Sequence, residues 1–422
     1  MPPRPSVTVN GSVPSPSRRR LLSSAAAGTL SLAGCTDLLR EDDGDDERDA
    51  PPVGEWPART YDALNTNHLS AGFTPPADPQ RLLTFETTLG DPSGLAVGER
   101  TAFVGFNRSL YAVSRVDGRV RWQRDFPYVG TNRVVLANGR VYAGLQRGMA
   151  AFDARDGSEV WRNESLDYNG LDFAVREGVL YTVSIHGRAI AVDAASGEER
   201  WTTSIPVYSL GVLTVTDRRV LATPSPLYPA DEESRDEYGV YALDRETGER
   251  LWSWTEPRHA VAKPAVADGT VYAAANEDGA YAIDAKTGNR EWYASTDAAS
   301  AMPTALDSTV FLPRTDGTVG VLDADSGRQQ ASLDADGAVT TGVAVTPGEY
   351  DGWQWLPRAV YFGTEAGTVH RVEYPTEERS ESSTPRTSVS LGAPVVTPPK
   401  VRGKFALVGT ADGDVHVLGD VH

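Results

Sequence analysis

Short segments in which apolar and polar residues alternate recur along most of the chain, separated by turn residues. Residues 261–295 show one complete unit, VAKPAVAD, TVYAAAN, AYAIDAK and NREWYAS, and each segment has the period of two expected of a β-strand. Two-residue turns separate the segments at 268–269, 278–279 and 287–288, and each of these turns ends in the glycine that tight hairpins favour. The pattern predicts a sheet of four antiparallel strands.

An eleven-residue phrase of the form AxDxxTGxxxW repeats along the chain. Its glycines are separated by 39, 40, 51, 40 and 39 residues, at Gly118, Gly157, Gly197, Gly248, Gly288 and Gly327. A period near forty with turn residues at fixed offsets is typical of propeller blades. Four positions after the glycine the sixth unit has Ala331, and the first five have a tryptophan that we expect to dock one blade onto the next: Trp122, Trp161, Trp201, Trp252 and Trp292.

Counting the units predicts eight blades, with seven as the alternative. Residues 359–374 form a seventh unit that has lost the turn and the tryptophan, and residues 392–419 supply three strands of an eighth. The missing outer strand is expected at residues 81–88, where Phe85 falls near the docking position. Strands from both ends of the chain would then close the ring and leave only short edges. The sequence therefore predicts one all-β propeller domain over residues 59–422.

The N-terminal region has a different pattern. Residues 17–35 place Arg18 and Arg19 before an apolar run that ends in Leu-Ala-Gly-Cys35, and this run is too short to span a bilayer. Residues 1–35 resemble a twin-arginine export signal with a lipobox, in which Cys35 becomes the lipidated N-terminus after cleavage. Residues 36–58 are acidic and proline-containing, and they predict a disordered tether. We therefore expect an exported protein anchored by lipid to the outer face of the cell membrane.

Composition narrows the classes of function. Cys35 is the only cysteine, which excludes an internal disulfide and a cysteine-based zinc cluster. Asp and Glu number 58 against 40 Lys and Arg, and the net charge of −18 argues against nucleic acid as a partner. The acidic, lysine-poor composition resembles that of proteins from salt-loving archaea. The alternative is that the acidic charge serves solubility alone. In molar salt the Debye length is about 3 Å, so the self-repulsion of such a surface is screened.

The phrase AxDxxTGxxxW at this spacing resembles the repeat of pyrroloquinoline-quinone-type β-propellers. This superfamily includes quinoprotein alcohol dehydrogenases and cofactor-free binding proteins such as the lipoprotein of the outer-membrane barrel assembly machinery. The resemblance covers about residues 56–419, and residues 55–70 resemble the lead-in of many members.

The resemblance leaves several functions open. The dehydrogenases of the superfamily have a vicinal disulfide, which this chain cannot form, and a Glu, Asn and Asp set around calcium, which we cannot place by motif. The six histidines show no metal-ligand spacing. The sequence favours a non-catalytic propeller, without cofactor or metal, that binds or scaffolds envelope proteins or glycans. The alternatives are a dehydrogenase that uses pyrroloquinoline quinone with calcium, and a carbohydrate-active propeller.

Candidate sites follow from the repeat. The residues just before the inner strands share one face with an insertion at 223–239, and several could line a pocket for an anionic or sugar-like ligand: Tyr128, Arg133, Tyr168, Asp172, Tyr208, His259 and Lys263. The alternative is that they are ordinary solvated loop positions. Two N-x-S sequons mark Asn107 and Asn163 as candidate glycosylation sites.

Overall fold

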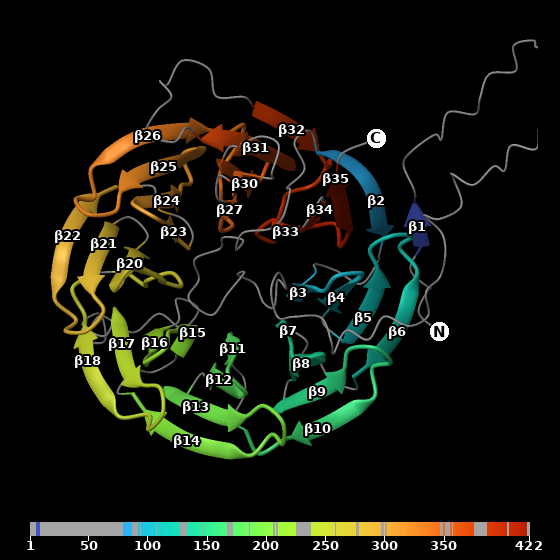
Figure 1. Ribbon diagram of the computed structural model, residues 1–422, viewed down its shortest axis with the longest axis horizontal. Helices are drawn as coiled ribbons and strands as arrows, with labels where there is room; N and C mark the ends of the chain where they lie inside the picture. The colour runs from blue at the N-terminus through green and yellow to red at the C-terminus, as the bar shows by residue number, and fades with distance from the viewer. Residues whose placement is uncertain are drawn as a thin grey trace, which may run out of the picture.

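The strands form eight radial blades around a central axis (Figure 1). The structure is a computed structural model that describes residues 6–8 and 79–419, with gaps of which the longest are 87–91, 127–132, 167–171, 225–237, 351–354 and 375–385. Within these residues all regular secondary structure is β. The same residues contain no helix that could cross a membrane. The prediction of an all-β, eight-bladed propeller is confirmed.

Blades 1 to 6 each consist of four consecutive antiparallel strands, which follow one another from the axis outwards. The first three blades are β3 (Gly94–Val97), β4 (Thr101–Phe106), β5 (Ser109–Ser114) and β6 (Val120–Asp125); β7 (Val134–Ala137), β8 (Arg140–Gly144), β9 (Met149–Asp153) and β10 (Glu159–Asn163); and β11 (Phe173–Arg176), β12 (Val179–Val183), β13 (Arg188–Asp193) and β14 (Glu199–Ser204). The next three are β15 (Leu210–Val215), β16 (Arg219–Pro224), β17 (Val240–Asp244) and β18 (Arg250–Trp254); β19 (Ala265–Ala267), β20 (Thr270–Ala275), β21 (Gly279–Asp284) and β22 (Arg290–Ser295); and β23 (Thr304–Leu306), β24 (Thr309–Pro313), β25 (Thr318–Asp323) and β26 (Gln329–Asp334).

Blades 7 and 8 depart from this plan. Blade 7 has a small hairpin, β28 (Glu349–Tyr350) and β29 (Trp355–Leu356), inserted between its first two strands, and its sheet is β27 (Ala344–Thr346), β30 (Arg358–Gly363), β31 (Thr368–Tyr374) and β32 (Arg386–Ser390). Blade 8 combines β33 (Lys400–Arg402), β34 (Phe405–Gly409) and β35 (Val415–Gly419) with β2 (Gln80–Glu86). The N-terminal strand therefore completes the C-terminal blade, as predicted.

Two details of this closure differ from expectation. Leu83, not Phe85, follows the bulge on the outer strand and pairs with Val417, in the register that Trp292 and Ala282 have in blade 5. Phe85 lies two residues further along and its ring packs on Tyr111 of blade 1, with centroids 5.9 Å apart. Both side chains lie in one apolar cluster with residues of blade 1, so together they take the place of one tryptophan.

The second difference is an additional strand. β1 (Ser6–Thr8) pairs antiparallel with the outer edge of β2, in a region where the sequence predicted no strand. An outer strand leaves backbone donors and acceptors unpaired, and β1 satisfies some of them. The proposed signal residues Arg18, Arg19 and Cys35, and the tether at 36–58, lie outside the described residues.

The structure places the five repeat tryptophans at the seams between blades. Each indole N–H donates to a backbone carbonyl of the next blade, at 2.8–3.1 Å, the acceptors being Ala154, Ala194, Arg245, Ala285 and Ala324. The ring also covers the turn glycine of that next blade, where an added Cβ would come within 2.5–2.7 Å of ring carbons. The fixed spacing of the phrase therefore joins residues of two different blades.

The turn that carries this glycine is stabilised by its aspartate. In blade 5 the Asp284 carboxylate accepts the backbone N–H groups of Lys286 and Thr287 at 3.1 and 2.6 Å. Gly288 then adopts a φ of +77°, which a residue with a Cβ reaches only with strain. Aspartate and glycine thus hold the turn in the shape on which the preceding blade docks.

Candidate functional site

The inner strands bring three of the predicted face residues together. Arg133, Asp172 and Lys263 precede β7, β11 and β19, the inner strands of blades 2, 3 and 5. Each blade has four antiparallel strands, so the chain leaves a blade at the same end at which it entered. The segments that lead into the inner strands therefore all lie at one end of the ring. We call these three residues the inner-strand ion cluster.

The Asp172 carboxylate is the centre of the cluster. Its Oδ2 lies 3.1 Å from Lys263 Nζ, and both side chains are almost fully buried, at 3% and 2% exposure. The same oxygen accepts the backbone N–H of Leu213 in blade 4 at 3.3 Å, and Oδ1 lies 4.0 Å from Nε of Arg133. One carboxylate therefore connects four consecutive blades at the ring centre.

The segment that carries Lys263 is held in place from blade 4. Thr214 donates its hydroxyl to the carbonyl of Pro264 at 2.7 Å, and both partners of this bond are buried. Lys263 thus reaches Asp172 from a fixed backbone position across the intervening blade. Removing one partner of a buried ion pair leaves an uncompensated charge, which costs about 3–5 kcal/mol.

The charges of the cluster limit its chemistry. The Asp172 carboxylate already faces one ammonium and one guanidinium group. Both groups would repel a metal cation that approached the carboxylate. Lys263 at 3.1 Å and Arg133 at 4.0 Å both lie against the one carboxylate. The arrangement therefore disfavours a divalent metal at Asp172.

The structure describes one other predicted face residue, His259, and it is not part of this cluster. His259 is exposed in the linker between blades 4 and 5. Tyr128, Tyr168 and Tyr208, and residues 225–237 of the insertion, lie outside the described residues. That this face binds a ligand stays a prediction.

One of the two sequons is part of a blade seam. The side-chain amide of Asn163 donates to the carbonyl of Gly197 in blade 3 at 2.6 Å, and its oxygen accepts the backbone N–H and the hydroxyl of Ser165. A glycan is attached through that amide nitrogen, so it would compete with the seam bond. Asn107 lies outside the described residues, and glycosylation at both positions stays a prediction.

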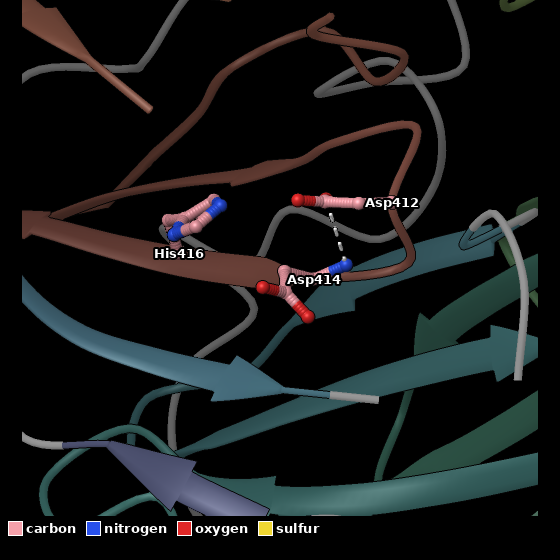
Figure 2. Close-up of side chains that lie close together, drawn as sticks. All are labelled: Asp412, Asp414 and His416. Atoms are coloured by element: carbon pink, nitrogen blue, oxygen red, sulfur yellow. Dashed lines mark hydrogen bonds between the residues drawn. The ribbon is translucent and has the colours of Figure 1, made fainter. Parts of the chain in front are cut away.

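A group of three metal-ligand residues that no sequence motif predicted lies at the closing blade (Figure 2). Asp412, Asp414 and His416 each offer a ligand atom, and these atoms lie within 4.8 Å of one another. The signal is the D-x-D-x-H spacing, which places Asp412 in the turn before β35, Asp414 directly before this strand and His416 near its start. The spacing between histidines alone does not reveal it.

Hydrogen bonds already occupy much of this group. His416 Nδ1 contacts the hydroxyl of Thr84, its Nε2 contacts the hydroxyl of Thr410, and Thr410 donates to Asp412, at 3.0, 3.0 and 2.6 Å. Burial, with a contribution from Arg81, lowers the pKa of His416 to about 4, so the imidazole is neutral at pH 7. The contact with Thr84 adds a side-chain link between β2 and β35 to the backbone pairing that closes the ring.

The fold defines the class, an eight-bladed propeller of the pyrroloquinoline-quinone type. A family model described as outer membrane protein assembly factor BamB matches residues 79–166 and 146–383. Since the match covers well over half of the chain, the protein belongs to this family.

Two groups of relatives share parts of the sequence. BamB of Alkalilimnicola ehrlichii is 33% identical over 134 residues, which are 30% of this chain and 31% of that protein. Quinohemoprotein alcohol dehydrogenase of Comamonas testosteroni is 29% identical over 143 residues, which are 31% of this chain and 20% of that protein. The chain thus spans under a third of the length of the curated relatives it matches.

Solved structures extend the likeness to the whole ring. BamB from Moraxella catarrhalis aligns with 81% of this chain and all of its own, with a TM-score of 0.61 and 18% identity. The Comamonas testosteroni quinohemoprotein alcohol dehydrogenase aligns with 90% of this chain and 83% of its own, with a TM-score of 0.65 and 15% identity. At these identities the structures show the shared fold alone.

Proposed function

We propose that the protein is an exported, lipid-anchored propeller whose role is to bind or scaffold other envelope components, and not to catalyse a reaction at its centre. Three features support the proposal: membership of the BamB family, whose name describes an assembly factor, the Cys35 lipobox, and the acidic tether that follows it. On this account the lipid holds the propeller at the outer face of the membrane, and the tether gives it reach.

The observation that carries the non-catalytic part is the state of Asp172. Calcium is bound by carboxylate and carbonyl oxygens that are free to coordinate it. Asp172 is instead bonded to Lys263 and Leu213 and has Arg133 on its other side. The inner-strand ion cluster therefore does not fit a calcium ion held beside a quinone, and its geometry is that of a buried link between four blades.

The partner is expected on the face where the inter-blade linkers lie. The linker residue His259 is exposed on this face, and the longest insertion of the repeat, 225–237, stands between β16 and β17 in the sequence.

Site-specific crosslinking tests this proposal on the full chain in its own membrane. A photo-reactive amino acid replaces His259, which is exposed on the linker face, or as a control Lys286, which is exposed in a turn at the opposite end of a blade. We expect discrete adducts with an envelope component from position 259 only. The same adducts from both positions, or none from position 259, would contradict it.

A quinone-dependent dehydrogenase with pyrroloquinoline quinone and calcium is the alternative, favoured by the local likeness to the Comamonas testosteroni enzyme. In that enzyme class the quinone supplies the redox chemistry. The chain's own Lys263 and Arg133 suit the carboxylates of such a cofactor, but the clamped Asp172 opposes the calcium.

A further inference from the structure

A second cluster of polar side chains lies in the outer part of the seam between blades 6 and 7, away from the inner-strand ion cluster. Ser388 Oγ is 2.7 Å from His370 Nδ1, and His370 Nε2 is 2.9 Å from Asp336 Oδ1. Hydroxyl, imidazole and carboxylate are thus connected in one line. We call these three residues the outer-seam relay.

Each member comes from a different part of the blade plan. His370 on β31 and Ser388 on β32 are directly opposite each other in the antiparallel pair. Asp336 belongs to the linker that leaves blade 6, and the hydroxyls of Thr364 and Thr368 donate to its two oxygens at 2.9 and 2.5 Å. The carboxylate is therefore fixed on the side of the imidazole opposite the serine.

The hydrogen bonds define which nitrogen carries the proton. Burial opposes ionisation of Asp336, but the bonds from Thr368, His370 and Thr364 outweigh it and lower its pKa to about 2. Burial and the neighbouring Arg386 lower the pKa of His370 below its usual range, although Asp336 opposes this. At pH 7 a neutral His370 donates Nε2–H to the Asp336 anion, which leaves the lone pair of Nδ1 for a donor on the other side.

That lone pair faces a reactive group that solvent can reach. Ser388 is exposed, whereas the His370 side chain has only 3% exposure. Arg386, two residues before Ser388 on the same side of β32, places Nη2 2.8 Å from the same Nδ1. The same Nη2 lies 3.3 Å from Nε2, so the guanidinium sits to the side of the imidazole near both ring nitrogens and leaves the Nδ1 lone pair to Ser388. The guanidinium is then near any negative charge that develops beside the serine.

We propose that Ser388 is a nucleophile for acyl transfer, with His370 as its general base and Asp336 as the positioning residue. A nucleophile within hydrogen-bond reach of a base that a third group orients is the signature of an activated hydroxyl. The relay is open on the outer surface, so the substrates it fits are small carboxylic esters. This chemistry goes beyond the proposed binding function and does not depend on it.

The reaction balances as an ester hydrolysis. Ser388 Oγ forms a bond to the carbonyl carbon while its proton passes to Nδ1 of His370, and Arg386 faces the resulting oxyanion. The ester C–O bond breaks and the alcohol leaves with that proton. Water then attacks the acyl-serine, gives a proton to Nδ1, and releases the carboxylic acid and the Ser388 hydroxyl.

Covalent labelling of the full chain tests the relay. A fluorophosphonate probe and p-nitrophenyl acetate are used with the wild type, Ser388→Ala and the matched control Ser390→Ala, whose serine is exposed two residues further along β32. Peptide mass spectrometry locates the label. We expect it on Ser388 in the wild type and in Ser390→Ala, and we expect its loss in Ser388→Ala and in the urea-unfolded wild type.

Two further variants separate activation from mere exposure. His370→Gln removes the base and should slow labelling about 100-fold or more. Asp336→Asn should slow labelling and also lower the pH of half-maximal labelling, because it leaves Arg386 as the charged group acting on His370. Equal labelling of Ser388 and Ser390, or a His370→Gln or Asp336→Asn rate equal to that of the wild type, would overturn the proposal.

Discussion

The contact between Trp161 of blade 2 and Gly197 of blade 3 yields a quantitative prediction for the docking of blades. Gly197 has a φ of +79°, and a Cβ added there would lie 2.7 Å from Cε3 of Trp161. Gly178, in another turn of blade 3, has a φ of +75° and nothing within 4 Å of its added Cβ. Alanine at the two positions therefore has similar backbone strain, but only Gly197→Ala meets a neighbouring ring.

The magnitudes follow from these two terms. The left-handed backbone costs an alanine about 1–2 kcal/mol, which is the whole expected effect of Gly178→Ala. Overpacking against the indole adds about 1–3 kcal/mol for Gly197→Ala. Trp161→Ala alone should cost about 3–5 kcal/mol, and loss of the 3.0 Å bond to Ala194 contributes about 1 kcal/mol of this.

A double-mutant cycle isolates the contact. With Trp161 already replaced by alanine, Gly197→Ala should cost no more than Gly178→Ala, so the double mutant is more stable than the sum of its single changes by about 1–3 kcal/mol. Urea unfolding in molar KCl, followed by circular dichroism, measures the free energies of unfolding. Strict additivity, or equal losses for the two glycine variants in the wild-type background, would refute the docking argument.

Three further predictions concern the anchor, the closing blade and the charge. Cys35→Ser should release the protein from membranes into the medium, which fractionation and immunoblotting would show; a membrane-bound mutant contradicts the lipoprotein interpretation. His416 has a folded pKa of about 4 against an ordinary value of 6.5, so the unfolded chain takes up the proton first as pH falls. Neutral His416 therefore contributes fully to stability above about pH 6.5, and the free energy of unfolding falls by about 3 kcal/mol between pH 6.5 and 4. His416→Gln should reduce this pH dependence in urea titrations, and an unchanged pH dependence would contradict the prediction. Dialysis from molar to 0.01 M salt lengthens the screening distance to about 30 Å, so carboxylates repel one another across the ring. The two-ended blade 8 and blades 6 and 7, whose outer strands lack the docking tryptophan, should open first and expose residues 81–88 and 300–419 to protease. Cuts spread evenly over all blades would contradict this order.

The ring was predictable because each repeat contains the residues that form its own turns. Glycine and tryptophan at fixed offsets identified six units, and the three strands left at 392–419 required an outer strand from elsewhere in the chain. The docking residue of blade 8 was misassigned to Phe85 because β2 has neither the turn glycine nor the tryptophan that fixes the register of the other outer strands. The bulge between Arg81 and Leu83 matches the bulge before the docking tryptophans, and it aligns Leu83 with them.

The sites were predictable only where the repeat itself aligns them. Arg133, Asp172 and Lys263 occupy equivalent positions before inner strands, so their convergence followed from blade equivalence. The outer-seam relay joins a linker residue to two strands of a blade whose phrase has decayed, and no spacing within one repeat connects Asp336 to Ser388. Unlike the tryptophan contacts, this contact across a seam follows from no repeated phrase, and it depends on how blades 6 and 7 pack.

The claim that this propeller binds without redox catalysis is tested most directly by titrating the full chain with pyrroloquinoline quinone and calcium. Absorbance of the bound quinone and alcohol-dependent reduction of a dye are followed in molar salt. The clamped Asp172 predicts no calcium-dependent binding and no dye reduction. Stoichiometric, calcium-dependent uptake of the quinone accompanied by dye reduction would contradict the account and assign the protein to the dehydrogenases.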